Sequence, residues 1–225
     1  MSTRPFLTKQ DSIAVTGVAN LEIRSLLDRQ QFYDPVGQAE GLGISSAAWP
    51  LFGLLWPSAA RLAARMAARV LVANERILEI GCGLALPSLV AHRRGADVTA
   101  SDRHPLAASF LRHNLQLNKL RPMKYRFANW SRTAAPTAPL ADGFDLIVGS
   151  DVLYERDVNG DLAAMIDRNA RPVAEIWIVD PDRGNRGPFN RRMSSYGFAC
   201  REQRLDCAGT AQDDAYKGRL LSYVR

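Results

Sequence analysis

The chain has 225 residues, a formal net charge of +6 and an apolar share of 47%, which indicates a single domain with one substantial core. Its positive charge comes mainly from arginine and is spread along the chain, so nucleic acid is not indicated as a partner. The sequence shows no continuous apolar run of the kind that an export signal or a membrane span needs, which predicts a cytoplasmic protein without a membrane partner.

The first 55 residues differ from the rest in their pattern of apolar residues, glycines and prolines. Residues 21–26 alternate weakly, as an exposed strand does, and glycines and prolines interrupt the stretch 41–57. We expect residues 1–55 to form an accessory segment over a cofactor and substrate cleft, and residues 56–225 to form the main domain.

From residue 76 onward, short apolar runs alternate with helical patterns, which predicts an α/β fold with a Rossmann-like, mostly parallel sheet covered by helices on both faces. A surface loop is expected over 133–143. The last two strands are close in sequence, so we expect an antiparallel terminal hairpin with the final strand inside the sheet. The strands are expected near 76–80, 97–101, 123–128, 144–149, 175–179, 197–204 and 219–224, and the helices near 58–72, 87–94, 105–118 and 159–169.

The segment 77–83, Ile-Leu-Glu-Ile-Gly-Cys-Gly, indicates a nucleotide-shaped cofactor site. A strand ends at Ile80, and Gly81 and Gly83 let the backbone turn where a Cβ would collide with a ligand. Asp102 follows the next strand about 20 residues later, where an acidic residue accepts hydrogen bonds from ribose hydroxyls. A tight turn without a ligand is the structural alternative for a lone glycine pair.

The identity of the cofactor depends on two departures from the dinucleotide pattern. Leu86 stands where a third glycine is expected, and Pro87 follows it. Glu79 would repel a diphosphate, but it suits a cofactor that carries an amino group and a sulfonium. The site therefore indicates S-adenosylmethionine, with S-adenosylhomocysteine as product, more than a nicotinamide dinucleotide.

Three further groups follow strand ends or precede the first helix of the main domain. Asn129 and Trp130 offer an amide for an adenine edge and a face for stacking. Asp151 and Tyr154 follow the fourth strand, where carboxyl ends of parallel strands place ligands. Trp56 precedes Pro57. Each of these residues alone has a structural alternative, as a core side chain or a turn cap, and their joint placement favours a site.

Two groups of arginines and the cysteines are interpreted as structural. Arg61, Arg65 and Arg69 recur at helical spacing and predict a solvated helix face. The group Arg183, Arg186, Arg191 and Arg192 follows a predicted strand end and has a better claim to contact an acidic substrate, although solvent is again the first interpretation. The three cysteines lack the spacing of a zinc site, which predicts free thiols and no bound metal.

Over roughly residues 50 to 180, these segments together resemble the seven-strand protein-lysine methyltransferases of methyltransferase family sixteen. Asp151 and Tyr154 match that family's D-x-x-Y motif, and Trp56 with Pro57 matches its W-P segment. The resemblance implies that the positions matching the following residues line the cofactor: Trp56, Gly81, Cys82, Gly83, Asp102, Trp130 and Ser150. Many members have Asp where this chain has Asn129.

The resemblance implies an N-methyltransferase that acts on a protein lysine amine, with Asp151 and Tyr154 orienting that amine. The chief alternative is methylation of a small-molecule amine, because some relatives act on amines such as nicotinamide. A non-catalytic protein that binds S-adenosylmethionine is a further alternative. A nucleic-acid amino-methyltransferase ranks lower, because prolines are absent between Asp151 and Tyr154. A nicotinamide-dependent oxidoreductase is disfavoured by Glu79 and Leu86.

Overall fold

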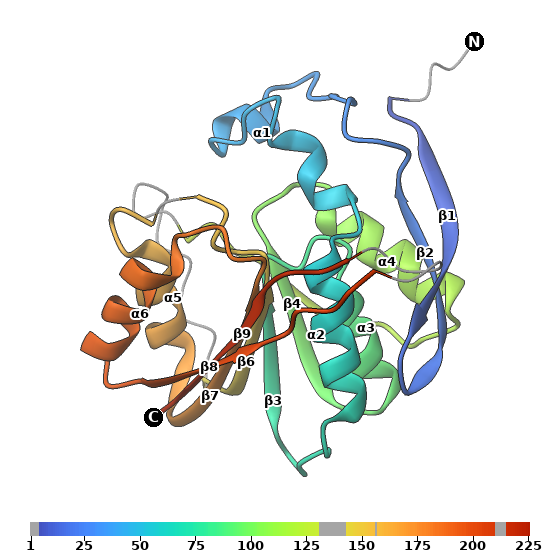
Figure 1. Ribbon diagram of the computed structural model, residues 1–225. Helices are drawn as coiled ribbons and strands as arrows, with labels where there is room; N and C mark the ends of the chain where they lie inside the picture. The colour runs from blue at the N-terminus through green and yellow to red at the C-terminus, as the bar shows by residue number, and fades with distance from the viewer. Residues whose placement is uncertain (1–4, 131–142, 156, 210–214) are drawn as a thin grey trace.

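A computed structural model describes residues 5–130, 143–155, 157–209 and 215–225. In this part of the chain, one mixed sheet has the strand order β5-β4-β3-β6-β7-β9-β8, and a separate hairpin pairs β1 with β2. Helices α2, α3 and α4 cover one face of the sheet and α5 and α6 the other (Figure 1). The predicted Rossmann-like α/β fold is therefore confirmed.

The predicted strands of the main sheet all form. They are β3 (Arg76–Ile80), β4 (Asp97–Asp102), β5 (Lys124–Phe127), β6 (Phe144–Ser150), β7 (Ala170–Asp180), β8 (Ala199–Arg204) and β9 (Arg219–Val224). β9 pairs antiparallel with β7 and with β8, so the final strand lies inside the sheet, as predicted. The predicted loop over 133–143 falls outside the described residues except for Gly143.

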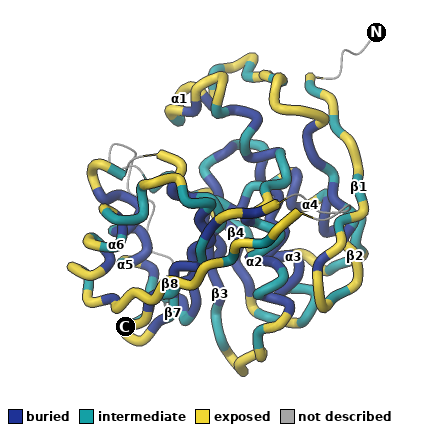
Figure 2. The backbone as a smooth tube through the Cα atoms, in the orientation of Figure 1, coloured by how far each residue is buried: buried dark blue, intermediate teal, exposed yellow. Residues whose placement is uncertain are grey.

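Burial on both faces explains why the central strands β3 and β6 read as nearly continuous apolar runs. In β3, Ile77 belongs to the apolar cluster under α2 and α3, whereas Leu78 and Ile80 belong to the cluster under α5 and α6. The same division continues in β6, where Leu146 and Ile147 join opposite clusters. Buried backbone accordingly runs through the centre of the sheet and exposed backbone through the outer loops (Figure 2).

The helices agree with the predictions except near two arginine groups. They are α2 (Pro57–Ala68), α3 (Leu86–Arg93), α4 (Ala107–Leu117), α5 (Asp161–Asn169) and the unpredicted α6 (Arg186–Ser195). α2 ends four residues early because Arg69 is extended at ψ 136°.

The Arg65 and Arg69 guanidinium groups each lie 5.4 Å from the ring centre of Trp177 on the sheet, and the Arg61 guanidinium lies 5.3 Å from that of Tyr216. The prediction of a solvated arginine face was therefore wrong: these side chains pack on aromatic rings.

The N-terminal segment begins with a hairpin that packs on α4. It comprises β1 (Thr8–Val15) and β2 (Val18–Leu26). Asn114 on α4 and Asn118, the residue that caps the end of this helix, bind the backbone of Arg24 and Glu22 with both amide atoms of each side chain. These amides pair the backbone N–H and C=O groups on the edge of β2 that faces away from β1, as a further strand would.

The rest of the N-terminal segment lies over the carboxyl ends of β3 and β4 (Figure 1). It contains α1 (Gln38–Gly41) and the short helix η1 (Trp49–Gly53). Trp49 is buried against Phe6, Phe52 and His104, with ring centres 5.5 to 5.9 Å apart. The segment and the main domain thus share one apolar core, and the Phe52 ring reaches the end of the sheet where ligands bind in this class of fold.

Candidate active site

A cavity of about 510 Å³ opens at the carboxyl ends of β3, β4 and β6, beneath η1. This volume lies in the range of small-molecule and cofactor pockets. Seven of the residues predicted to bind the cofactor line it: Trp56, Gly81, Cys82, Gly83, Asp102, Trp130 and Ser150. The predicted catalytic residues Asp151 and Tyr154 line it as well. The sheet therefore brings together residues that are up to 98 positions apart in sequence.

The turn after β3 requires both of its glycines. Gly81 and Gly83 have φ angles of 56° and 52°, in the left-handed region that favours glycine. A Cβ on Gly83 would lie 2.8 Å from the carbonyl oxygen of Phe52, and a Cβ on Gly81 would lie 3.0 Å from Val152 Cγ1. Side chains at these positions would therefore force the turn away from η1 and from Val152, which follows β6.

Asp102 is fixed at the tip of β4 by two backbone donors. Its Oδ2 accepts the N–H of Gly83 and its Oδ1 accepts the N–H of His104, both at 2.8 Å. A carboxylate oxygen can accept more than one hydrogen bond, so each retains capacity for a ligand hydroxyl. This geometry suits the predicted contact with a ribose.

The other lining residues that were predicted to bind the cofactor include two indole rings and a thiol. Trp56 is held by a hydrogen bond from its Nε1 to the carbonyl oxygen of Leu51, 2.9 Å away. Trp130 lies across Gly81, where its Cη2 is 3.3 Å from the position of a Cβ. Burial raises the pKa of the Cys82 thiol, which stays neutral. Asn129, also predicted for this site, is not among the residues that line the cavity.

Glu79 does not reach the cavity, contrary to the sequence prediction. It is 1% exposed, and its carboxyl group accepts the backbone N–H of Ser88 at 3.0 Å and the Ser88 hydroxyl. Burial raises its pKa to about 8, so most of the population is uncharged at neutral pH. Glu79 therefore anchors the first turn of α3 and offers no charge to a cofactor amino group. Its alternation with Leu78 and Ile80 already placed it on the α3 face of the sheet.

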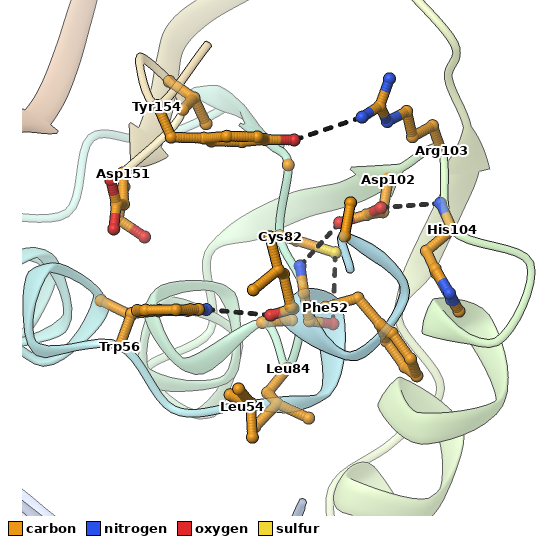
Figure 3. Close-up of a pocket in the computed structure, with 18 of the residues that line it drawn as sticks. Phe52, Leu54, Trp56, Cys82, Leu84, Asp102, Arg103, His104, Asp151 and Tyr154 are labelled. Atoms are coloured by element: carbon orange, nitrogen blue, oxygen red, sulfur yellow. Dashed lines mark hydrogen bonds between the residues drawn. The ribbon is translucent and has the colours of Figure 1, made fainter. Parts of the chain in front are cut away.

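Asp151 and Tyr154 lie at the opposite end of the cavity from His104, with Trp56 facing them (Figure 3). Asp151 has a φ of 54°, and its N–H donates to the carbonyl oxygen of Val179 at 2.8 Å. Both of its carboxylate oxygens accept hydrogen bonds from Arg183, at 2.6 and 2.7 Å. The Tyr154 hydroxyl accepts a hydrogen bond from Arg103 Nη2 at 3.3 Å.

Sequence reasoning did not assign several residues that line the cavity, namely Arg29, Phe52, Arg103, His104 and Arg183. Two of them directly follow Asp102 at the end of β4, so their position was a usable signal. Arg183 was noted only as part of an arginine group. Arg29 and Phe52 belong to the N-terminal segment, whose path over the sheet the sequence pattern did not reveal.

His104 lines the cavity as a neutral imidazole and does not serve as an acid or a base. Its ring stacks on Phe52 with centres 3.7 Å apart and planes at 10°. Its Nδ1 accepts the N–H of Leu106 at 3.2 Å, which assigns the ring proton to Nε2. Burial lowers the pKa of this imidazole to about 3.

The described residues contain neither a helix long and apolar enough to cross a bilayer nor a group of three His, Cys, Asp or Glu side chains arranged to hold a metal ion.

The strand order, the glycine turn and the acidic residue at the end of β4 define the class I methyltransferase fold. A model of the lysine methyltransferase family matches residues 52–186. This match covers more than half of the chain, and the chain belongs to that family. The family assignment confirms the predicted resemblance, and with it S-adenosylmethionine as the cofactor.

Among curated proteins, the chain is similar to the electron transfer flavoprotein beta subunit lysine methyltransferase of Danio rerio, with 28% identity over 67% of this chain and 57% of that protein. It is 33% identical to the histone-arginine methyltransferase METTL23 of Rattus norvegicus, over 74% of this chain and 76% of that protein. The human METTL23 is 30% identical, with 90% of that protein covered. The chain thus spans little more than half the length of the zebrafish relative.

Solved structures agree on the fold. The precorrin-6y C5,15-methyltransferase of Geobacter metallireducens has a TM-score of 0.57 at 14% identity, over 74% of this chain and 86% of that one. The ribosomal protein L11 methylase of Lactobacillus delbrueckii subsp. bulgaricus also has a TM-score of 0.57, at 19% identity, over 76% and 80%. At such identities the likeness concerns the fold alone.

The residues present fit S-adenosylmethionine. Glycine at positions 81 and 83 lets the turn pack directly against Val152 and Phe52, so that the backbone of the turn itself lines the cavity. Asp102 keeps hydrogen-bonding capacity for a ribose, and the rings of Trp56 and Trp130 line the same cavity.

Proposed function

We propose that this chain is an S-adenosylmethionine-dependent N-methyltransferase whose acceptor is a side-chain nitrogen of a protein, with a lysine amine as the first candidate. One observation carries the proposal: Asp151 and Tyr154, which match the family's D-x-x-Y motif, line the end of the cavity opposite His104. Family membership over residues 52–186 supports the lysine acceptor. S-adenosylmethionine, when bound, supplies a methyl group on a sulfonium.

Positioning is the main task of the protein in such a transfer. The acceptor nitrogen must lie about 3 Å from the methyl carbon and in line with the departing sulfur. Its lone pair forms the new C–N bond while the C–S bond breaks and sulfur takes the electron pair. We assign Asp151 to accept an N–H of the acceptor, and Tyr154, on the same side of the cavity as Asp151, to limit its approach.

The acceptor must also be uncharged at the moment of attack. A lysine ammonium has an unperturbed pKa near 10.4, so it has to lose a proton first. Burial in the channel between Trp56 and Tyr154 favours the neutral amine. The nitrogen proton that leaves after attack can pass to Asp151 or to water at the open end of the cavity.

An arginine guanidinium is the second candidate acceptor. The rat and human relatives named histone-arginine methyltransferases cover 74% of this chain. In addition, the Asp151 carboxylate already holds a guanidinium through two hydrogen bonds, which is the geometry that an arginine acceptor would require.

We further propose a cytoplasmic location. The three cysteines are unpaired thiols, with Cys82 buried and Cys200 exposed. Unpaired thiols, one of them on the surface, are typical of a reducing compartment.

The acceptor is tested with a methyl-labelled cofactor and cell extract. We expect label in discrete protein bands, and hydrolysis of those bands should yield methyl-lysine. Methyl-arginine in the hydrolysate would select the second candidate. Label confined to the low-mass filtrate would contradict a protein substrate and favour a small-molecule amine.

The role of Asp151 is tested by Asp151→Asn in the same assay. The amide cannot accept a proton or balance a cation, so we expect transfer to fall by at least about 100-fold, within the range of general acid–base contributions. Cofactor affinity, measured by calorimetry, should change by no more than a few fold. Asp97→Asn is the matched control, because Asp97 is exposed at the amino end of β4 and pairs with Lys124. Near-normal transfer by Asp151→Asn would refute the assignment.

A further inference from the structure

A second cavity, of about 920 Å³, meets the cofactor cavity at Asp151. The hairpin β1–β2 contributes Lys9, Asp11 and Ile13, alternate residues that share one face of β1. The segment before β9 contributes Ala215, Tyr216 and Lys217. Six residues line both cavities, and they mark the junction: Arg29, Leu54, Leu55, Trp56, Asp151 and Arg183.

The ion pair of Arg183 with Asp151 lies at this junction. Arg183 Nε and Nη2 each donate to one oxygen of the carboxylate, a planar two-bond arrangement. The Asp151 side chain is only 9% exposed under this guanidinium, whereas the Arg183 side chain is 41% exposed. The Asp151 carboxylate therefore offers one binding position for a cationic group, which we call the seat. In this structure the Arg183 guanidinium occupies the seat.

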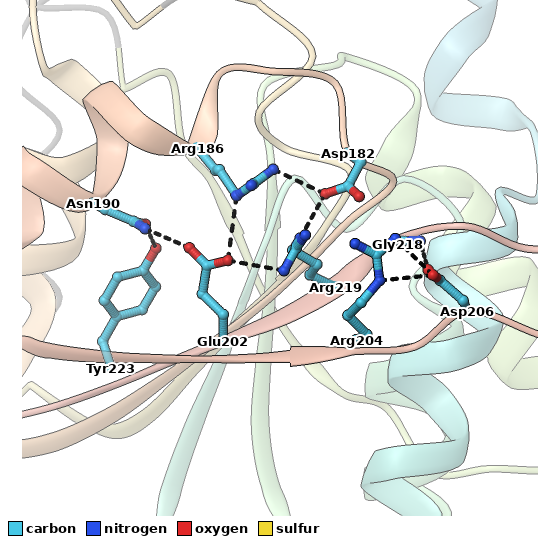
Figure 4. Close-up of polar contacts among 9 residues, drawn as sticks. All are labelled: Asp182, Arg186, Asn190, Glu202, Arg204, Asp206, Gly218, Arg219 and Tyr223. Carbon is cyan, nitrogen blue, oxygen red and sulfur yellow. Dashed lines mark hydrogen bonds and ion pairs between the residues drawn. The ribbon is translucent and has the colours of Figure 1, made fainter.

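The backbone that carries Arg183 is held in place independently of this ion pair. Asp182 accepts hydrogen bonds from Arg186 and Arg219, both at 3.0 Å, and Glu202 pairs with the same two arginines at 3.3 Å (Figure 4). Asn185, on the other side, donates to the carbonyl oxygen of Leu153 at 2.8 Å. Because these contacts fix the neighbours of Arg183, its side chain can leave Asp151 without movement of the loop.

We propose that the acceptor side chain enters through the second cavity and displaces Arg183 from Asp151. Until the acceptor binds, the Arg183 guanidinium occupies the acceptor's position on the Asp151 carboxylate. This inference rests on the proposed function for the identity of the acceptor, but not for the existence of the seat. It makes Arg183 a determinant of specificity: only a side chain that competes with a guanidinium for Asp151 gains access to the methyl group.

The seat is tested first by binding, without turnover. The protein is saturated with S-adenosylhomocysteine, and n-butylguanidine and n-butylamine, which match the ends of arginine and lysine side chains, are titrated by calorimetry. We expect Arg183→Ala to bind at least one of the two probes at least tenfold more tightly than the unchanged protein. Arg183→Lys should give a smaller gain, because an ammonium lacks the planar pair of donors.

Two further variants make the result specific. In the double variant Arg183→Ala with Asp151→Asn, the gain in affinity should disappear, because the seat has lost its charge. Arg191→Ala is the matched control: Arg191 is an exposed arginine of α6 that lines neither cavity, and its loss should leave probe binding unchanged. Equal probe affinities in Arg183→Ala and the unchanged protein would overturn the proposal.

The second test measures transfer of a labelled methyl group to n-butylamine and n-butylguanidine. We expect Arg183→Ala to raise kcat/KM at least fivefold for the probe that it binds more tightly. A loss of kcat larger than tenfold with unchanged KM would overturn the proposal and identify Arg183 as a residue that positions Asp151. If no variant transfers a methyl group but the binding results hold, the proposed function fails while the seat stands.

Discussion

Asp151 adopts a left-handed backbone conformation, which costs a residue with a Cβ about 1–2 kcal/mol. The hydrogen bond from its N–H to Val179 holds the turn, and the side chain is thereby directed between Trp56 and Tyr154 (Figure 3). Such conformations persist where the surrounding structure enforces them, and they concentrate at functional sites. The strain at Asp151 therefore agrees with its assignment to the acceptor.

Glu79 yields a prediction about stability at the scale of one residue. Its folded pKa of about 8 lies above the value near 4.3 that an exposed glutamate has, so the folded state keeps a proton that the unfolded state has lost. The free energy of unfolding should fall by about 1.4 kcal/mol per pH unit through this group as the pH rises from about 5 to 8. Below this window both states are protonated, and above it both are ionised.

Glu79→Gln removes the titration and keeps an oxygen that can accept from Ser88. Urea unfolding at pH 5, 6, 7 and 8 should show the variant gaining stability relative to the unchanged protein at each step. The difference between the two profiles isolates Glu79 from Asp102, whose pKa is also raised by burial. Parallel profiles would show that Glu79 is ionised in the folded protein.

At the scale of elements, the attachment of the β1–β2 hairpin depends on two amides of α4. Asn114 is fully buried, and it binds Arg24 through N–H···Oδ1 at 2.8 Å and Nδ2–H···O at 3.3 Å. Since the hairpin forms one wall of the second cavity, these contacts link the core of the molecule to the proposed acceptor entrance.

Asn114→Ala should lower the free energy of unfolding by about 1–3 kcal/mol, because the half-buried N–H and carbonyl groups of Arg24 lose their partners. Hydrogen exchange should quicken at Arg24 more than at β3. Asn20→Ala is the control, since Asn20 is exposed near the turn of the hairpin and its side chain donates to the exposed Ser12 hydroxyl at 3.4 Å. An unchanged stability would mean that apolar packing alone holds the hairpin.

The elements that sequence patterns revealed are those with strong apolar periodicity. Strands β3, β6 and β7 are buried on both faces, so they appear as continuous apolar runs. Helix α6 was missed because only Phe189 and Met193 are buried in a segment rich in arginine. Strand β1 was missed for a related reason: most of its side chains are exposed or half-buried, and its pairing with β2 defines it.

At the scale of the whole molecule, the position of the cofactor cavity followed from topology. Strands that run parallel end at one edge, so residues after β3, β4 and β6 had to meet there. The second cavity could not be predicted in this way. It depends on how the hairpin, residues 54–58 and the segment before β9 come together, and these segments are far apart in sequence and carry no shared pattern.

The ion pair of Asp151 with Arg183 could not be predicted from the sequence either. The two residues follow neighbouring strands, β6 and β7, but nothing in the sequence distinguishes Arg183 from the other arginines near it. The structure separates them by environment: Arg183 faces the junction of the cavities, while Arg186 belongs to the ion-pair network with Asp182 and Glu202 (Figure 4).

The proposed function requires S-adenosylmethionine to lie across the ends of β3, β4 and β6 with Asp102 on its ribose. Calorimetric titration of S-adenosylmethionine into the unchanged chain, Asp102→Ala and Asp97→Asn tests this most directly. We predict saturable binding of one cofactor per chain, weakened by at least about tenfold in Asp102→Ala, as expected for lost hydrogen bonds to a charged group, and unaltered in Asp97→Asn. Absence of binding to the unchanged chain, or equal affinities for all three proteins, would contradict it.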